Sequence, residues 1–214
     1  MKKLLLIAAI ASSMAPFAAQ AESTFVTNTG TQSASARLDF RVVVPKVLFL
    51  QVGTGTNFTN NTTVNRVEFN VPAGAIGNGT AVAGTGGDLA SGAVTVRVLG
   101  NSGTVSLTNA TTGPLSSGVA GDPTVPWSDI VVTPGALATA TTGFSNAAID
   151  HPPFNVAAAG GTSATATTLT ASAGLVRREG SWTFAYANTA TLPAGTYGDT
   201  IGNNGRVTYT ATAP

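Results

Sequence analysis

The stretch ARLDFRVVVPKVLFLQVG, from Ala36 to Gly53, is the longest strand-like run in the chain. Apolar and polar residues alternate through its first half, which predicts a strand with one buried face over Ala34 to Val44. Proline cannot donate to a β-ladder, so Pro45 divides this run from a second predicted strand, Val47 to Val52. The even, apolar positions are Ala34, Ala36, Leu38, Phe40, Val42 and Val44 before the proline, then Leu48, Leu50 and Val52.

The chain begins with the pattern of a secretory signal peptide. Lys2 and Lys3 precede an apolar run, and Ala19-Gln20-Ala21 supplies the small residues of a cleavage site. We therefore predict a signal peptide at residues 1–21 and an exported mature chain that starts at Glu22. The apolar run is interrupted and shorter than the roughly 20 residues of a membrane span, which favours a cleaved leader over a membrane anchor. No second apolar run is long enough to span a bilayer, so the mature chain is not expected to be membrane-spanning.

Composition narrows the class of protein. Charged residues make up only 9% of the 214 residues, and loss of the two leader lysines leaves the mature chain close to neutral. A basic surface for nucleic acid is therefore not expected. The chain has no cysteine, so stability must come from burial and strand pairing rather than disulfides. Abundant Gly, Thr, Ala and Val with few helix formers indicate an all-β protein.

Alternation between turn residues predicts eight or nine short strands and no helix after the leader. This pattern is typical of an immunoglobulin-like β-sandwich in one domain, residues 46–214, preceded by an N-terminal tail, residues 22–45. Beyond the two opening strands, the predicted ranges are Val64 to Val71, Ala93 to Leu99, Thr104 to Thr108, Trp127 to Thr133, Ser181 to Ala187 and Arg206 to Ala213, with a weaker one at Thr165 to Ala171.

Two local features complete the predicted layout. The segment GAVTVRVLGNSGTVSLTN, residues 92–109, has two alternating runs around a Gly/Asn turn, which predicts a β-hairpin. Residues 53–63, 74–92 and 134–174 are rich in Gly, Ala and Thr and poor in bulky apolar residues. We predict long surface loops there rather than a second core.

The sequence offers little for catalysis, so we expect neither an enzyme nor a cofactor. His151 is the only histidine, and adjacent Asp150 cannot orient it as a general base because neighbours in a Pro-rich loop point in different directions. It is interpreted as a loop residue, and no metal-ligand spacing accompanies it. Arg177-Arg178-Glu179 is interpreted as a solvated loop end. The aromatic residues Trp127, Trp182, Phe184 and Tyr186 are interpreted as core rather than as a sugar-stacking site.

The apolar face of residues 34–44 needs a partner. It can pair within the chain's own sheet, as an ordinary edge strand, or with another copy. Addition of a strand between copies has a physical mechanism, because main-chain hydrogen bonds supply affinity while alternate side chains fill pockets. We favour the second option, since the run lies in a tail near the mature N-terminus.

Several segments, in order, resemble pilin subunits of the archaic chaperone–usher pili, the spore coat protein U-like family. They are SARLDFRVVV, KVLFLQVG, VEFNVP, the 92–109 segment, VPWSDIVVT and the terminal LPAGTYGDTI with RVTYTATA. LPAGTYGDT is the most specific, because it is similar to the G-x-Y-x-D-T that opens the last pilin strand. Two features depart from the family: cysteines common in relatives are absent, and IGNNG, residues 201–205, interrupts the last strand.

This resemblance implies an incomplete immunoglobulin-like fold that the tail of the next subunit completes. By the same resemblance, Leu38, Phe40, Val42 and Val44 form the donor-strand interface, in this or an adjacent register. The partners implied are neighbouring pilus subunits, a periplasmic chaperone and an outer-membrane usher, so the chain would pass through the periplasm to the cell surface.

We therefore predict a structural subunit of a surface pilus or fimbria-like fibre, assembled by donor-strand exchange and serving adhesion or biofilm formation. Two alternatives stay open from the residues alone. One is a self-contained secreted β-sandwich that binds a ligand, such as a glycan, through Trp127 or its loops. The other is a small outer-membrane β-barrel, for which the alternating runs are short and the aromatic residues few.

Overall fold

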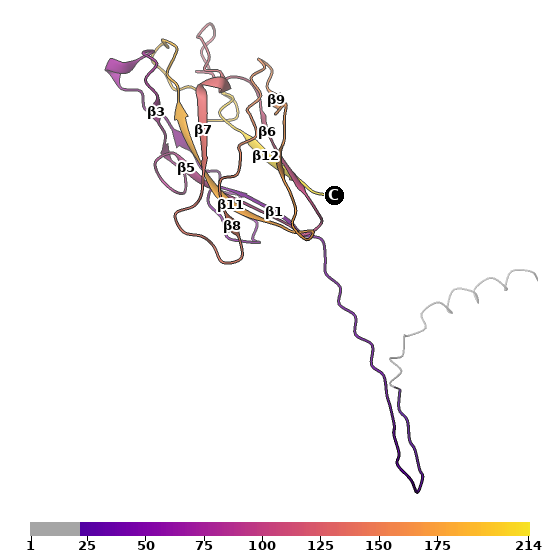
Figure 1. Cartoon of the computed structure of the whole chain (residues 1–214). Coiled ribbons are helices and arrows are strands. Elements are labelled where there is room, and N and C mark those ends of the chain that lie inside the picture. Colours follow the sequence, from indigo (N-terminus) through magenta and orange to yellow (C-terminus); the bar gives the residue numbers. More distant parts are fainter. Residues whose placement is uncertain (1–21) are drawn as a thin grey trace, which may run out of the picture. The chain divides into compact units, whose positions relative to one another are not determined.

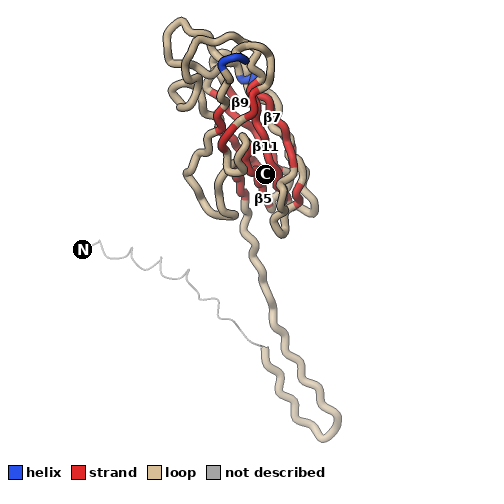
Figure 2. The backbone as a smooth tube through the Cα atoms, turned by 90° about the vertical axis from the view of Figure 1, so that its left-hand side faces the viewer, coloured by secondary structure: helices blue, strands red, loops and turns tan. Residues whose placement is uncertain are grey.

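The computed structural model describes residues 22–214 (Figures 1 and 2). The predicted signal peptide, residues 1–21, lies outside them. The chain divides into two compact units, one ending at Pro45 and the other spanning Lys46–Pro214. The second unit is nearly all β, with two short 3-10 helices, Ala73–Ala75 and Trp127–Asp129. Within residues 22–214, no helix has the length and apolar character needed to cross a membrane.

The larger sheet has six strands in the order β1-β5-β11-β3, with β7 and β8 also pairing with β11. Its centre is the antiparallel pair β5 and β11, in which Arg97 lies opposite Glu179. β1 is antiparallel to β5 and lies at the sheet's edge. The strands are β1 (Leu48–Val52), β3 (Val82–Ala83), β5 (Ala93–Gly100), β7 (Ile130–Gly135), β8 (Ser145–Asn146) and β11 (Val176–Tyr186).

The smaller sheet is built on β6 (Val105–Thr111). β12 (Thr208–Thr212) pairs antiparallel with one edge of β6. β9 (Gly161–Thr162) and β10 (Thr167–Leu169) both pair antiparallel with the other edge of β6. A separate two-stranded ladder joins β2 (Val67–Glu68) and β4 (Thr85–Gly86).

The hydrophobic core lies between the two sheets. Val96 and Val98 of β5, Val105 and Leu107 of β6, and Trp182 of β11 are all fully buried and belong to one cluster. Since this cluster joins side chains from both sheets, the prediction of an all-β sandwich-like fold is confirmed. A second cluster contains Trp127, Ile130 and Tyr186 with Phe184 packed against it, so the four predicted core aromatics do contribute to the core.

The predicted hairpin at residues 92–109 is wrong. Both strands exist as β5 and β6, but β5 pairs with β1 and β11, whereas β6 pairs with β9, β10 and β12. The turn at Gly100 to Thr104 therefore carries the chain from one sheet to the facing one. In a hairpin and in a crossing between sheets alike, alternation places the same side chains in the core, namely Val96, Val98, Val105 and Leu107. The local sequence therefore could not distinguish a hairpin from a crossing.

Other boundaries also differ from prediction. Residues 34–44 are assigned to no strand and form no β-ladder, and the contacts that the preceding tail residues make with them include no ladder pairing. The predicted strand at 64–71 shortens to Val67–Glu68. Residues 134–174 are only partly surface loop, since they contain β8, β9 and β10 and the buried Ile149 and Pro152. β11 begins at Val176, so the expected solvated loop end is instead strand, with Glu179 fully buried.

Candidate functional site

β1 and β12 are edge strands that lie near each other at one side of the sandwich. β1 pairs only with β5, and β12 pairs only with β6. Some Cα atoms of β1 and β12 lie within 8 Å of each other, yet no β-ladder joins the two strands. We call this side, formed by β1 and β12, the open edge.

The ladder registers give the directions of the two strands. Leu48, at the start of β1, is paired with Gly100, and Thr212, at the end of β12, is paired with Ser106. Since Gly100 and Ser106 flank the turn between β5 and β6, β1 begins where β12 ends. At that end, Nζ of Lys46 donates a hydrogen bond to the Pro214 carbonyl at 3.2 Å. The strands of the open edge are thus antiparallel.

Both strands of the open edge have an unpaired side. Beyond the β6 ladder, no backbone–backbone hydrogen bond among the described residues involves β12. The additional backbone bonds of the β1 segment, from Asn101 N to Val47 O and from Gly53 N to Thr95 O, only extend its ladder with β5. Free N–H and C=O groups on an edge strand can pair with a further strand.

The core is incompletely covered at the open edge. Leu48 retains 42% of its exposure, whereas Val96, Val98 and Leu107 in the sandwich centre have 0%. The side chains that pack against the central cluster from this side are only half-buried, and two of them, Ala211 on β12 and Ala213 just after it, are alanines. The half-buried side chains are Leu50, Val52, Tyr209, Ala211 and Ala213.

The four residues predicted for the donor-strand interface all lie in the first unit and are exposed. The exposed fractions are 73% for Leu38, 88% for Phe40, 87% for Val42 and 74% for Val44. Earlier in the tail, Glu22 forms an ion pair with Arg37 and the Thr24 hydroxyl donates to the Ser35 carbonyl. The run from 38 to 44 therefore presents large apolar side chains without cover inside its own unit, which is uncommon for a soluble segment.

Inside the sandwich, the segment IDHPPFN, residues 149–155, enters between the sheets. Ile149 and Pro152 are fully buried, and His151 is half-buried. Nε2 of His151 shares a 2.8 Å hydrogen bond with the Tyr209 hydroxyl, and its ring lies edge-on to Trp182 with a centroid separation of 4.6 Å. Burial lowers the pKa of His151 to about 4. The histidine is indeed on a loop, but this loop fills the interior.

The outer face of the larger sheet carries a buried ion pair. Nε of Arg97 donates to Oε2 of Glu179 at 2.9 Å, and Nη2 of Arg97 donates to the Thr141 hydroxyl at 2.8 Å. Burial raises the pKa of Glu179, but hydrogen bonds from Thr141 and Arg97 outweigh this effect and hold the pKa below its usual value. These contacts fasten the 136–147 segment, which includes β8, to the sheet.

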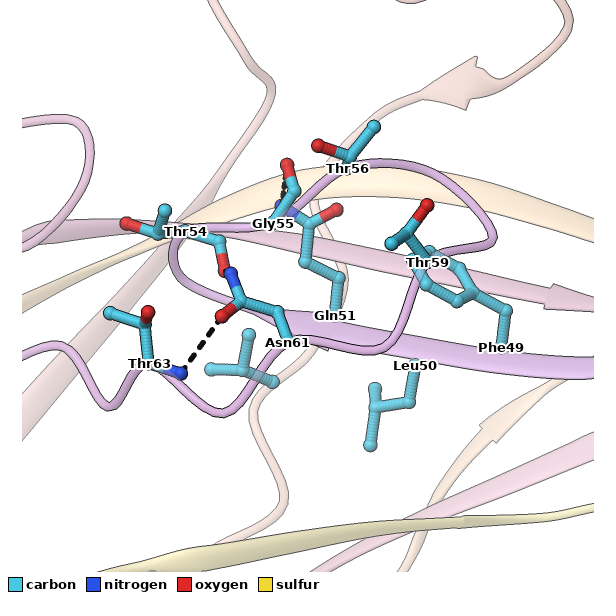
Figure 3. Close-up of a pocket in the computed structure, with 10 residues that line it drawn as sticks. Phe49, Leu50, Gln51, Thr54, Gly55, Thr56, Thr59, Asn61 and Thr63 are labelled. Atoms are coloured by element: carbon cyan, nitrogen blue, oxygen red, sulfur yellow. Dashed lines mark hydrogen bonds between the residues drawn. The ribbon is translucent and has the colours of Figure 1, made fainter.

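A small polar cavity lies beside β1, under the loop of residues 53–63 (Figure 3). The loop is held by its own hydrogen bonds, since Nε2 of Gln51 donates to the Gly53 carbonyl at 2.8 Å and Thr63 N donates to Oδ1 of Asn61 at 2.8 Å. The cavity volume of about 90 Å³ holds only a few water molecules. Among residues 22–214, no cluster of three or more His, Cys, Asp or Glu could bind a metal ion.

Sequence reasoning identified β1 and β12 as strands but did not single out the five half-buried residues of the open edge. Their alternation was visible, with Leu50 and Val52 on one strand, Tyr209 and Ala211 on the other, and Ala213 just after its end. What was not visible is that β1 and β12 lie at the edges of facing sheets.

Comparison with known proteins adds no relative. No protein-family model matches the chain, and no match was found among curated proteins or solved structures. The functional argument therefore depends on the open edge and the exposed tail.

Proposed function

We propose that this protein is a structural subunit of a surface pilus or fimbria-like fibre, in which the tail of one copy completes the sandwich of the next. The observation that carries the proposal is the open edge, where β1 and β12 leave core side chains half-buried. One chain thus has an edge that lacks a strand and a tail with the alternation of a strand.

The chemistry of the two parts is complementary. The unpaired edge of β12 supplies main-chain N–H donors and C=O acceptors, and the backbone of the tail supplies the same groups to pair with them. Leu38, Phe40, Val42 and Val44 would enter the space beside Ala211 and Ala213, where the short side chains leave room. Full burial of each such apolar side chain is worth about 1.5–3 kcal/mol.

Strand capture requires a local movement. Neighbouring strands lie about 4.8 Å apart, so two strands that flank a third are separated by about 9.6 Å. Since some Cα atoms of β1 and β12 lie within 8 Å of each other, the open edge must widen there by at least about 1.6 Å to admit a full strand. An edge that relaxes inward when empty is consistent with a core that lacks one strand.

The occupant proposed is the tail of a second copy. Insertion of each copy's tail into the next copy is a heterologous contact, and such contacts generate fibres where successive copies do not close a ring. Export through the periplasm, delivery by a chaperone and an outer-membrane usher, and a role in adhesion or biofilm formation are part of the same proposal, and the resemblance to archaic chaperone–usher pilins supports them.

Deletion of residues 34–44 tests this function. The control deletes residues 23–33, which has the same length but spares the alternating run. Size-exclusion chromatography with light scattering should show that the control still associates head to tail, while the 34–44 deletion stays monomeric and loses thermal stability. Equal association of both deletion variants would refute the donor-strand role.

A further inference from the structure

The segment IDHPPFN is tied to both sheets on either side of His151. Nε1 of Trp182, in the larger sheet, donates to the Ile149 carbonyl at 2.7 Å. Nδ2 of Asn109, in the smaller sheet, donates to the carbonyls of Pro152 and Pro153. Because the donors are buried and rigidly placed, the backbone of His151 is held from two directions.

His151 then makes one further bond, to the strand of the open edge. The Tyr209 hydroxyl lies 2.8 Å from Nε2 of His151. Tyr209 is central in β12 and directly opposite Asn109 in the β6 ladder. Since β12 has a ladder on only one side, this interior bond is its second anchor.

We infer that His151 is a positioning residue for binding of the added strand. Its hydrogen bond holds Tyr209, and therefore β12, in the position that backbone pairing with the added strand requires. The inference depends on the proposed function. It assigns a role to the chain's single histidine that is neither catalytic nor metal-binding.

Among residues 22–214, neither the ring contacts of His151 nor the lining of the cavity beside it includes a charged side chain. The ring contacts are Phe154, Trp182, Phe184 and Tyr209. The cavity, of about 350 Å³, reaches the ring from the β7 side, where Ile130, Val132 and Trp127 form part of its lining. Of the nearest acidic residues in sequence, Asp150 is exposed and Asp129 accepts a hydrogen bond from Thr189.

Capture of a strand should also be felt at the histidine. A strand paired with β12 would hold Tyr209 in place and keep its hydroxyl bonded to the neutral ring of His151. A hydrogen bond to the neutral form of imidazole disfavours the charged form. The pKa of His151 should therefore fall when a strand is bound, and by linkage a proton on His151 should weaken capture by the same factor.

The test uses the full chain with Val42→Asp, which disables its own tail and leaves the open edge empty. A synthetic peptide of residues 34–45 is the probe, and its affinity is measured by fluorescence anisotropy. Tyr209→Phe should weaken peptide binding about fivefold, the equivalent of one hydrogen bond of about 1 kcal/mol. Tyr186→Phe is the matched control, because the Tyr186 hydroxyl is buried without a hydrogen-bond partner.

A second measurement separates positioning from mere stability. The ring protons of the only histidine can be followed by NMR without ambiguity. In the parent chain, which is the full chain with Val42→Asp, the peptide should shift the signals of these ring protons and lower the pKa of His151. In the same chain with Tyr209→Phe added, the peptide should lower this pKa much less. Binding of the peptide to Tyr209→Phe with parent affinity, together with an unmoved histidine signal, would overturn the inference. Absence of any peptide binding to the parent chain would instead refute the proposed function.

Discussion

Arg97 and Glu179 face each other across β5 and β11, with Nε of Arg97 2.9 Å from Oε2 of Glu179 and the carboxylate fully buried. Gln51 of β1 and Asn146 of β8 continue the same row across the larger sheet. This row crosses four strands on the face opposite the core. The ion pair therefore couples the edge strand β1 to the centre of its sheet.

Removal of Arg97 should be costly. Arg97→Ala leaves Glu179 buried without its cation, and loss of one partner of a buried pair typically costs about 3–5 kcal/mol. Urea unfolding would measure this. Arg66→Ala is the control, since Arg66 pairs with Asp199 at the surface, where such pairs contribute about 0–1 kcal/mol. Similar losses for the two variants would contradict the structural role of the row.

The stability of the fold should fall in mild acid because of His151. Burial lowers its pKa from the ordinary 6.5 to about 4, so the unfolded chain binds a proton more readily than the folded chain within this window. The stability contribution is complete above pH 6.5 and is lost as the pH falls to about 4, by about 3 kcal/mol.

The free energy of unfolding, measured against pH by urea titration, checks this expectation. His151→Asn should remove the slope between pH 6.5 and 4.5 while leaving, below pH 4.5, the loss that follows from the lowered pKa of Glu179. An unchanged slope in the variant would show that His151 does not cause it.

Two glycines with similar backbone angles should respond differently to alanine. Gly92 has φ of 71° and Gly79 has φ of 76°, so each alanine pays about 1–2 kcal/mol for the left-handed conformation. A Cβ at Gly92 would also meet the Cα of Gly84 at 2.6 Å, whereas one at Gly79 meets nothing within 4 Å. Thermal unfolding should therefore show a clearly larger loss for Gly92→Ala, and equal losses would refute the close approach.

A bulky residue at the open edge should block association without unfolding the subunit. Ala211 faces the core and is half-buried, while the adjacent Thr210 is exposed. Ala211→Phe should fill the space proposed for the tail and lower head-to-tail association by at least tenfold in sedimentation velocity. Thr210→Phe, the matched control, should associate normally. The opposite order would place the binding site elsewhere.

Much of the fold could be predicted from local patterns, since β1, β5, β6 and β12 follow the alternation of their residues. The pairing of strands could not, because a short turn after Gly100 allows either a hairpin or a crossing between sheets. The burial of Glu179 was missed for a related reason, because its partner Arg97 is distant in sequence. Without a visible partner, the charged triplet of residues 177–179 was predicted to be exposed to solvent.

The sequence identified only one half of the proposed site. The apolar face of the tail was identified from Leu38, Phe40, Val42 and Val44, because their alternation with other residues can be recognised without knowledge of the fold. The open edge depends on which strands end each sheet, and the role of His151 depends on a loop that enters the interior. Both are long-range properties that a single sequence does not reveal.

The central claim, that one face of the tail is captured by another copy, is tested most directly at two neighbouring valines. Val42 and Val43 are both exposed, at 87% and 71%, but belong to opposite faces of the alternating run. Sedimentation velocity of the full-length variants should show that Val42→Asp abolishes head-to-tail association while Val43→Asp retains it. Equal association of the two variants, or equal loss, would contradict the account.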